Sequence, residues 1–363
     1  MNLGSDTTSP AHPRVMEALM RANSGAAVPY GNDPISHEAL ERVRDFFEAP
    51  EAEVFLVPSG SAANGLSLSA LVQPWQNVYC SAIAHIHSDE CGAPEFFTNG
   101  ARMVLVPEEH GKITLADLEA AITEGFERGL HYTQPGAVAL TQVTERGTVY
   151  TLDELHALTA VARTHSLPVH LDGARFANAM VALGCTAAEM SWKAGIDAVS
   201  FGGTKNGLLG VEAVVVFDPA LASSVIYRQK RAGLLFSKQR YLSAQMAEYL
   251  TGSLCRDLAA AANGAMARLA AGIRKLPDAV IHHPVDANIM FVSLPRAVHR
   301  AALADGPAYF MAPEELEAGP DSELIPTRLV TNWATTDADI DRLLVLMSGP
   351  ETPVSPAPQE QHA

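Results

Sequence analysis

The stretch Asp197-Ala-Val-Ser-Phe-Gly-Gly-Thr-Lys-Asn-Gly207 organises the chain. Its apolar run, residues 198–201, predicts a buried strand, and the glycines after it let the backbone turn tightly and approach a ligand. The turn presents one amine, that of Lys205, at the mouth of the predicted sheet. An amine that is partly removed from water and lies beside other cations has a lowered pKa and can form a Schiff base. Lys205 is therefore the candidate nucleophile, although for this stretch alone a surface lysine in a glycine-rich turn is the commoner alternative.

A second apolar run, Leu167-Pro-Val-His-Leu-Asp-Gly-Ala-Arg175, ends in a carboxylate. Ligands of open parallel sheets bind beyond the carboxyl ends of the strands, so we expect Asp172 and Lys205 to point into one crevice. This pairing suits pyridoxal phosphate, which is held by a lysine Schiff base and needs a carboxylate beside its pyridine nitrogen. Taken alone, Asp172 is equally explained as a turn or helix-capping residue.

A third stretch, Val54-Phe-Leu-Val-Pro-Ser-Gly-Ser-Ala-Ala-Asn-Gly65, runs from a predicted strand through a turn of small residues into a helix beginning near Ser61. Backbone N–H groups at such a helix start form an anion site that suits a phosphate. Ser59, Gly60 and Ser61 are small enough for close approach, although an ordinary serine cap explains them as well. Together the three stretches favour one ligand, pyridoxal phosphate, more than any of them does separately.

Seven segments of the chain resemble, in order, those of low-specificity L-threonine aldolases, and the chain is also similar to phenylserine aldolase. The segments are Ser5-Asp-Thr-Thr, Tyr30-Gly-Asn-Asp33, Pro58-Ser-Gly-Ser61, His85-Ile-His-Ser-Asp-Glu-Cys-Gly92, His170-Leu-Asp-Gly-Ala-Arg175, Phe201-Gly-Gly-Thr-Lys-Asn-Gly207 and Arg328-Leu-Val-Thr-Asn-Trp333. The resemblance extends from Asn2 to about Ser348. It implies a lyase that cleaves β-hydroxy-α-amino acids, with L-threonine or L-allo-threonine giving glycine and acetaldehyde.

The resemblance also implies a fold, that of the fold-type-I pyridoxal-phosphate enzymes. Alternating strands and helices support right-handed βαβ units around a mostly parallel sheet, and therefore an α/β large domain. A smaller C-terminal α+β domain follows. We place the N-terminal arm and the large cofactor-binding domain at residues 1–243, the small domain at 244–348 and a disordered, proline- and glutamine-rich tail at 349–363.

Two histidines receive roles from the resemblance. It implies that the ring of His85 stacks on the pyridine ring of the cofactor, and that His131 lies near the substrate hydroxyl as a proton-transfer or orienting group. A lone histidine after a strand is otherwise usually an ordinary surface or loop residue. The catalytic base is left open between His131 and a water held near His85.

The substrate carboxylate is expected to meet positive charge. By resemblance, Arg328 grips it in a bidentate contact, Arg175 and Ser5 assist, and the turn at Tyr30 lies near the active site of a neighbouring subunit. From composition alone, Arg328 would be an exposed residue on a strand and Ser5 part of a frayed terminus. The resemblance further implies a homotetramer built from two dimers.

Local patterns predict several helix starts. Ser36 is the expected cap of a helix over residues 36–47, and the spacing Thr114-x-x-Asp117 imitates a capping box. Thr151-x-x-Glu154 is a full capping box that opens a helix. A basic helix is predicted over residues 221–231.

Composition agrees with a small-molecule enzyme. The 363 residues are 48% hydrophobic, so the chain can bury a large core. A net charge of −16 argues against nucleic acid or an anionic membrane as partner, because either would attract a basic surface. The start of the sequence lacks a signal-peptide pattern, which favours a cytoplasmic location. The four cysteines have no metal-ligand spacing, so we expect reduced thiols and no functional metal.

Alternative functions follow from the same fold. Transamination, racemisation, β-elimination and decarboxylation also use fold-type-I enzymes, so the fold alone does not choose the reaction. A nearer alternative is an aldolase that prefers phenylserine. A regulator that has lost chemistry is disfavoured, because a binding module would not need Lys205, Asp172 and Arg328 together.

Overall fold

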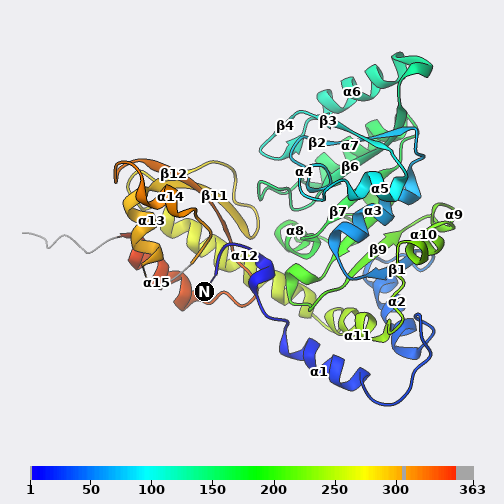
Figure 1. Ribbon diagram of the computed structural model, residues 1–363, viewed down its shortest axis with the longest axis horizontal. Helices are drawn as coiled ribbons and strands as arrows, with labels where there is room; N and C mark the ends of the chain where they lie inside the picture. The colour runs from blue at the N-terminus through cyan, green and yellow to red at the C-terminus, as the bar shows by residue number, and fades with distance from the viewer. Residues whose placement is uncertain (1, 305–307, 349–363) are drawn as a thin grey trace, which may run out of the picture.

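The computed structural model describes residues 2–304 and 308–348, and Figure 1 shows a large body and a smaller one joined by a long helix. The large body surrounds a seven-stranded sheet, and the smaller body contains a three-stranded sheet. The expected disordered tail, residues 349–363, lies outside the described residues.

The seven-stranded sheet is mostly parallel, which confirms the predicted α/β fold class. Its strands, in spatial order, are β1 (Glu53–Val57), β9 (Glu212–Val216), β8 (Ala198–Gly202), β7 (Val169–Gly173), β6 (Gln134–Thr141), β2 (Gln76–Ser81) and β3 (Arg102–Val106). Only β9 runs antiparallel to its neighbours, β1 and β8. The register pairs Thr141 with Asp172, and Asp172 with Ser200, so β6, β7 and β8 end at the same edge.

Helices cover both faces of this sheet. They and the short 3-10 turns of the large body are η1 (Asp6–Thr8), α1 (Pro13–Ala22), α2 (Pro34–Phe46), α3 (Gly60–Leu71), α4 (His85–Ser88), α5 (Ala93–Thr98), α6 (Leu115–Glu127), η2 (Gly129–His131), α7 (Leu152–Thr164), α8 (Phe176–Leu183), η3 (Trp192–Ala194), η4 (Thr204–Asn206), α9 (Pro219–Ala222), α10 (Val225–Arg231) and α11 (Arg240–Tyr249). A two-stranded hairpin, β4 (Glu108–Glu109) and β5 (Lys112–Ile113), follows β3. Among the described residues, no helix combines the length and apolar character needed to cross a membrane.

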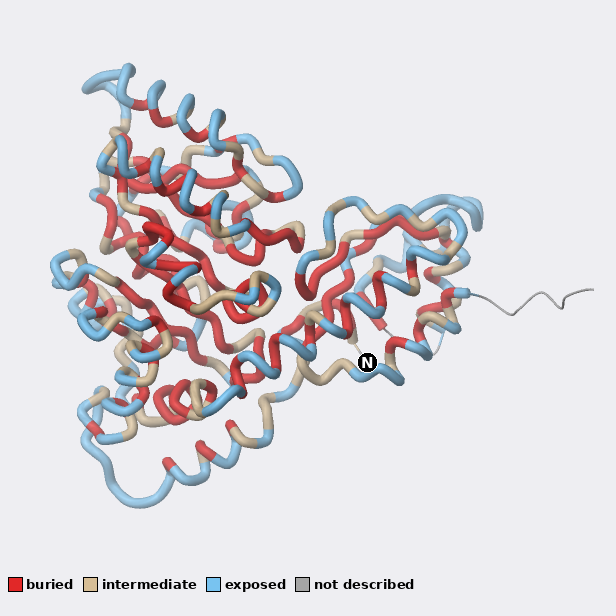
Figure 2. The backbone as a smooth tube through the Cα atoms, turned by 180° about the vertical axis from the view of Figure 1, so that it is seen from behind, coloured by how far each residue is buried: buried red, intermediate tan, exposed pale blue. Residues whose placement is uncertain are grey.

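Two hydrophobic cores lie on opposite faces of the sheet, and alternation along β9 separates them. Ala213 and Val215 belong to one core, whereas Val214 and Val216 belong to the other, because successive side chains of a strand point to opposite faces. The first core contains the packed aromatic rings of Phe47, Phe176 and Phe201. Figure 2 shows the central strands as the most continuously buried part of the large body.

The smaller body packs β10 (Val280–Ile281), β11 (Ile289–Pro295) and β12 (Leu324–Val330) against α12 (Leu254–Ile273), α13 (Arg296–Leu303), α14 (Pro313–Glu317) and α15 (Asp337–Ser348). The long helix α12 serves both bodies. Its residue Leu258 lies in the first core of the large body, and Met266 lies in the core of the small body. The change of core therefore falls inside α12, and the division into residues 1–243 and 244–348 stays a prediction.

The N-terminal arm ties the smaller body to the turn that carries Lys205. Leu3 is fully buried, and its carbonyl accepts a hydrogen bond from the backbone N–H of Val330 at the end of β12. Further along the arm, the backbone N–H of His12 donates to the carbonyl of Gly207 over 2.8 Å. The arm is thus held at both ends, which corrects the interpretation as a frayed terminus.

Two of the local predictions need correction. Asp33, not Ser36, caps α2: its Oδ1 accepts the backbone N–H of Ser36 over 3.0 Å, because the helix already begins at Pro34. The predicted basic helix over residues 221–231 is divided into α9 and α10. The predicted caps at the starts of α6 and α7 are confirmed.

The capping box of α7 leads to a stability prediction. The hydroxyl of Thr151 accepts the N–H of Glu154, and the Glu154 carboxylate accepts the N–H of Thr151 over 2.7 Å. Thr151→Ala leaves one donor of the first turn unpaired and should lower the free energy of unfolding by about 1 kcal/mol. Thr151→Ser keeps a hydroxyl acceptor and should therefore retain most of the stability of wild type. Urea titration followed by circular dichroism measures the difference. Equal stability of the alanine and serine variants would contradict the prediction.

Candidate active site

A cavity of about 240 Å³ opens where β6, β7 and β8 end. Its wall brings together Lys205, Asp172, Arg175, His85 and residues 59–61, which the sequence predicted for one site. These residues come from the ends of β2, β7 and β8 or the segments that follow them, and from the start of α3. They meet because parallel strands deliver the loops after their carboxyl ends to the same edge of a sheet.

Lys205 lies in the short turn η4, directly after β8. The turn is anchored by the side-chain amide of Asn206, which donates to the Tyr249 hydroxyl over 2.6 Å and to the Cys255 carbonyl over 3.0 Å. The positive charge of Arg175, together with burial, lowers the pKa of the Lys205 amine. A lowered pKa increases the neutral fraction of the amine, and the neutral form is the nucleophile.

Asp172 ends β7 with both carboxylate oxygens hydrogen-bonded. Oδ1 accepts the backbone N–H of Ala174 over 2.9 Å, and Oδ2 accepts the side-chain amide of Asn64 over 2.8 Å. The same amide donates to Glu90 Oε1 over 2.9 Å, so one amide holds two buried carboxylates in fixed positions. Asp172 can therefore present a carboxylate of defined orientation to a ligand.

His85 begins α4 and is held by a carboxylate. Its Nδ1 lies 2.8 Å from Glu90 Oε1, and the Glu90 side chain is shielded from solvent. The hydrogen bond to Glu90 raises the pKa of His85 above its ordinary value, against the opposing effect of burial. The contact also fixes the ring beside the cavity, as stacking on a planar ligand requires.

Residues 59–61 form the start of α3 on the cavity wall. The Ser59 hydroxyl caps the helix by accepting the backbone N–H of Ala62, and Gly60 has open space where a Cβ would lie. The helix contains 12 residues, long enough to present a set of oriented N–H groups at its first turn. This wall fits a phosphate or another anion.

Arg175 is held by the N-terminal arm. Its Nε and Nη2 donate to the two carboxylate oxygens of Asp6 over 2.6 Å and 3.1 Å. Burial alone would raise the pKa of Asp6, but the charges of Arg175 and Lys205 hold it below its ordinary value. The pair places a guanidinium on the cavity wall without leaving either charge unpaired.

Arg328, on β12, lies next to this pair. Its Nη2 donates to the carbonyl of Gly4 over 3.0 Å, and burial and the charge of Arg175 lower its pKa. Ser5, one residue further along the arm, caps η1 and shares a hydrogen bond of 2.8 Å with the Thr7 hydroxyl. Thr7 itself lines the cavity. Of the predicted carboxylate-binding residues, Arg175 lines the cavity, whereas Arg328 and Ser5 lie beside its wall, next to Arg175 and Thr7.

Two predicted residues lie away from this cavity. The exposed ring of Tyr30 contacts Lys230, whose amine lies 4.6 Å from the ring centroid. His131 is exposed in η2, before β6, whereas the cavity lies after β6. The eight-residue strand is about 25 Å long at 3.3 Å per residue, so His131 lies at the opposite end of the sheet. The proton-transfer role predicted for His131 therefore has no support within this chain.

Three carboxylates on the wall of the cavity had no role in the sequence analysis. Glu90 holds His85, and Glu212 accepts the backbone N–H of Gly203 over 2.7 Å in the turn before Lys205. Burial raises the pKa of both Glu145 and Glu212 to about 7. Glu145 comes soon after the end of β6, and a carboxylate near the end of a strand is the signal that identified Asp172, so sequence reasoning could have used it. Glu212 begins its strand, and no local pattern predicts its place.

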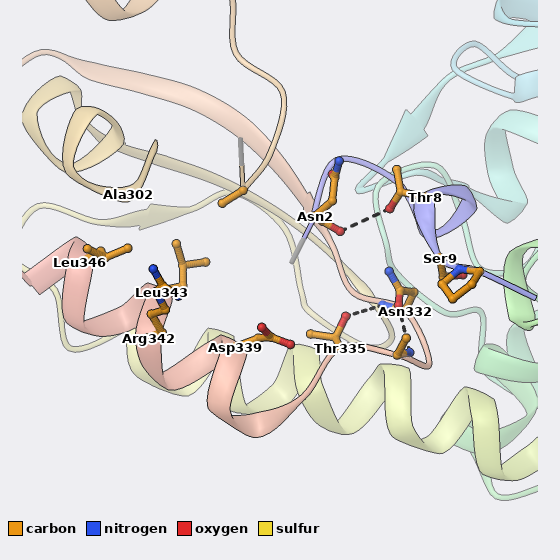
Figure 3. A pocket seen from close by; sticks show the side chains of 13 residues that line it. Asn2, Thr8, Ser9, Ala302, Asn332, Thr335, Asp339, Arg342, Leu343 and Leu346 are labelled. Atoms are coloured by element: carbon orange, nitrogen blue, oxygen red, sulfur yellow. Dashed lines mark hydrogen bonds between the residues drawn. The ribbon is translucent and has the colours of Figure 1, made fainter. Parts of the chain in front are cut away.

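A larger cavity, of about 590 Å³, lies between the arm and α15. Figure 3 shows its wall, where the Thr8 hydroxyl donates to the Asn2 backbone carbonyl, and the side chains of Asn332 and Thr335 accept backbone N–H groups. The residues predicted for the active site do not line it. Chemistry rather than size therefore identifies the smaller cavity as the candidate active site.

The contact between Glu90 and His85 leads to a prediction. Glu90→Gln removes the charge that favours protonated His85, so the pKa of His85 should fall. Histidine resonances followed by NMR during a pH titration measure this change. Glu48→Gln, which alters an exposed pair with Lys193, is the matched control and should leave the His85 titration in place. An unchanged His85 titration in Glu90→Gln would contradict the assignment.

Comparison with known proteins identifies the family to which this chain is similar. A family described as beta-eliminating lyase matches residues 2–296. The low-specificity L-threonine aldolase of Pseudomonas aeruginosa is 40% identical over 339 residues, which are 93% of this chain and 94% of that protein. The corresponding enzyme of Pseudomonas sp. (strain NCIMB 10558) is 42% identical over 290 residues, 80% of this chain and 83% of that protein.

Solved structures show the same architecture. The threonine aldolase of Leishmania major superposes with a TM-score of 0.86 at 28% identity, covering 95% of this chain and 97% of that one. Sphingomonas wittichii serine palmitoyltransferase, at 16% identity and a TM-score of 0.69, shares the fold; the match covers 96% of this chain and 86% of that one. The chain belongs to the low-specificity L-threonine aldolase family, whose members are fold-type-I pyridoxal-phosphate lyases.

Proposed function

We propose that this enzyme cleaves the Cα–Cβ bond of β-hydroxy-α-amino acids, converting L-threonine or L-allo-threonine into glycine and acetaldehyde with pyridoxal phosphate as cofactor. The observation that carries the proposal is the half-buried Lys205 side chain, whose amine has a lowered pKa, in one cavity with Asp172 and Arg175. The two Pseudomonas enzymes, named low-specificity L-threonine aldolases, support the choice of substrate.

The residues of the cavity fit pyridoxal phosphate. Lys205 would hold the cofactor through its side-chain nitrogen, and residues 59–61 would hold the phosphate at the start of α3. Asp172, positioned by Asn64, would keep a proton on the pyridine nitrogen, and His85 would cover one face of the ring. When bound, the cofactor supplies a sink for the electron pair of the broken bond.

The arginines at the rim would orient the substrate. Arg328 and Arg175 would bind its carboxylate, with the hydroxyl of Ser5 beside them, and so set which bond to Cα is broken. The arm contributes by holding Arg175 through Asp6 and Arg328 through the Gly4 carbonyl. Binding through charge-assisted hydrogen bonds leaves the β-substituent free to vary, which agrees with low side-chain specificity.

Two other activities use the same groups. An enzyme that prefers phenylserine would use the same residues in the same roles and would differ only in the space around the β-substituent. Comparing the rate of benzaldehyde release from phenylserine with that of acetaldehyde release from threonine distinguishes the two preferences. Transamination of alanine would release pyruvate instead. Both products are measured with coupled dehydrogenases in the same preparation.

We extend the proposal to assembly and location. A homotetramer made of two dimers would cover exposed apolar side chains such as Met20 and Tyr227, which are 72% and 76% exposed in the single chain. It would also bring the turn at Tyr30 beside a neighbouring active site. Light scattering after size exclusion tests the mass. The four cysteines are free, which supports a reducing, cytoplasmic location.

Loss of the Lys205 amine should abolish turnover. Lys205→Ala should lower the rate of acetaldehyde release from L-threonine by about 10³-fold or more, the order expected for removal of a covalent nucleophile. The visible absorption that wild type gains with pyridoxal phosphate should disappear as well. Lys193→Ala, on the surface, is the control and should retain both properties. A Lys205→Ala variant with the wild-type rate would refute the proposed function.

The role of Arg328 predicts a change in substrate affinity. Arg328→Lys keeps the charge but loses the planar pair of donors, so KM for L-threonine should rise about tenfold, equivalent to about 1.4 kcal/mol. Initial rates over a range of L-threonine concentrations measure KM and kcat separately. Arg300→Lys, in the exposed pair with Asp321, serves as the matched control. A KM unchanged by Arg328→Lys would place the carboxylate elsewhere.

A further inference from the structure

We propose that Glu145 is the catalytic base of this enzyme, taking the proton from the β-hydroxyl group of the substrate. The proposal rests on the proposed function and adds to it the residue that sequence analysis left open. It replaces His131, which lies at the other end of the sheet.

The position of Glu145 supports this role. It lies in the loop after β6, on the wall of the cavity that also contains Lys205. Its Oε1 accepts the backbone N–H of His85 over 2.8 Å and the hydroxyl of Thr141 over 3.0 Å. Both contacts come from elements of the site, so the carboxylate is oriented before a substrate binds.

The second oxygen of Glu145 is the one that lacks a hydrogen-bond donor within the described part of the chain. Oε2 is shielded from solvent and has no hydrogen-bond partner among the residues that the structure describes. A shielded carboxylate oxygen without a donor is costly to keep, and such groups are common where a ligand supplies the missing partner. A substrate hydroxyl is a donor of the right kind, because it gives a proton that the oxygen can accept.

The electrostatic surroundings suit a base that works near neutral pH. Burial raises the pKa of Glu145 to about 7, and the negative charge of Asp172 acts in the same direction. Cys80 and Tyr150 stay neutral in this range, because burial raises the pKa of both groups. The ionisable groups that face Glu145 or share its cavity are Asp172 on β7, Cys80 on β2, Tyr150 before α7, His85 on α4, Glu90 after α4, Arg175 after β7, Lys205 on η4 and Glu212 on β9.

The step balances as a proton transfer coupled to bond cleavage. The hydroxyl O–H bond breaks, its proton goes to Glu145 Oε2, and the electron pair left on oxygen forms the C=O bond of acetaldehyde. The electron pair of the Cα–Cβ bond stays with Cα, which then accepts a proton as glycine forms. When Glu145 gives up its proton the carboxylate is restored, and no further reactant is needed.

His85, Glu90 and Glu212 also line the cavity, but the hydrogen bonds of each make it unsuited to act as the catalytic base. The contact with Glu90 favours protonated His85, which is the wrong form for a base. Glu90 also has a shielded free oxygen, but its Oε1 holds both His85 and Asn64, so it acts as a positioning residue. Glu212 is bound to the backbone of the turn that carries Lys205.

Two variants test the proposal in the holoenzyme. Glu145→Gln keeps an acceptor for the His85 N–H but cannot take a proton, so kcat for L-threonine should fall by about 10²- to 10⁴-fold. Glycine should still bind with wild-type affinity, as measured by its effect on the visible absorption of the holoenzyme.

In wild type, kcat/KM should rise with pH through about 7, because the carboxylate is the active form. Thr141→Val removes a hydrogen bond that lowers the pKa of Glu145, so this rise should move to higher pH.

A spectroscopic readout is independent of turnover. The infrared difference between about pH 5.5 and about pH 8.5, on either side of the Glu145 pKa, should contain a band of a protonated buried carboxyl group. Burial also raises the pKa of Glu212 to about 7, so Glu145→Gln should reduce this band to the contribution of Glu212. Glu124→Gln, in an exposed pair with Arg128, should retain both the full band and the rate.

The outcomes separate this inference from the proposed function. A wild-type holoenzyme that releases no aldehyde from L-threonine or L-phenylserine would overturn both. Normal wild-type activity together with a Glu145→Gln variant of unchanged rate and pH dependence would overturn the role of Glu145 alone. Should Glu145→Gln fail to fold, an unmoved pH profile in Thr141→Val would overturn it equally.

Discussion

The ion pair between Arg175 and Asp6 is the interaction on which the site depends. A guanidinium beside a half-buried amine would be costly alone, and the Asp6 carboxylate offsets that cost by two hydrogen bonds. The remaining positive field lowers the pKa of Lys205, which makes the amine a nucleophile. Charge balance in one cavity thus links the stability of the arm to the reactivity of the lysine.

This ion pair joins parts of the chain that are far apart in sequence. The arm crosses from β12, where Leu3 pairs with Val330, to η4, where His12 binds Gly207 (Figure 1). Asp6 lies between these two attachments. The arm therefore places Asp6 against Arg175, just after β7, and the Gly4 carbonyl against Arg328, so that charges from both bodies lie next to one another.

The carboxylates that line this cavity have different tasks because their hydrogen bonds differ. Asp172 has both oxygens satisfied by an amide and a backbone N–H, which fixes its orientation. Glu90 pairs with the His85 ring, whereas Glu212 holds the backbone of the lysine turn. Glu145 alone among these four combines two donors on one oxygen with a raised pKa near neutrality. The surroundings of each carboxylate, rather than its residue type, thus decide whether it positions a neighbouring group or transfers a proton.

The sequence by itself determined the alternation of strands and helices and the mostly parallel sheet. It also determined the grouping of Lys205, Asp172 and residues 59–61, because each of these follows or ends an apolar run and parallel strands end at one edge of a sheet. Only the tertiary structure decided that Glu212 joins them: β9 runs antiparallel, and its first residue pairs with Gly202 at the end of β8. It likewise placed His131 and Glu145 at opposite ends of β6. Local periodicity reports that a strand exists, but the direction and identity of its neighbours depend on long-range pairing, which no short pattern contains.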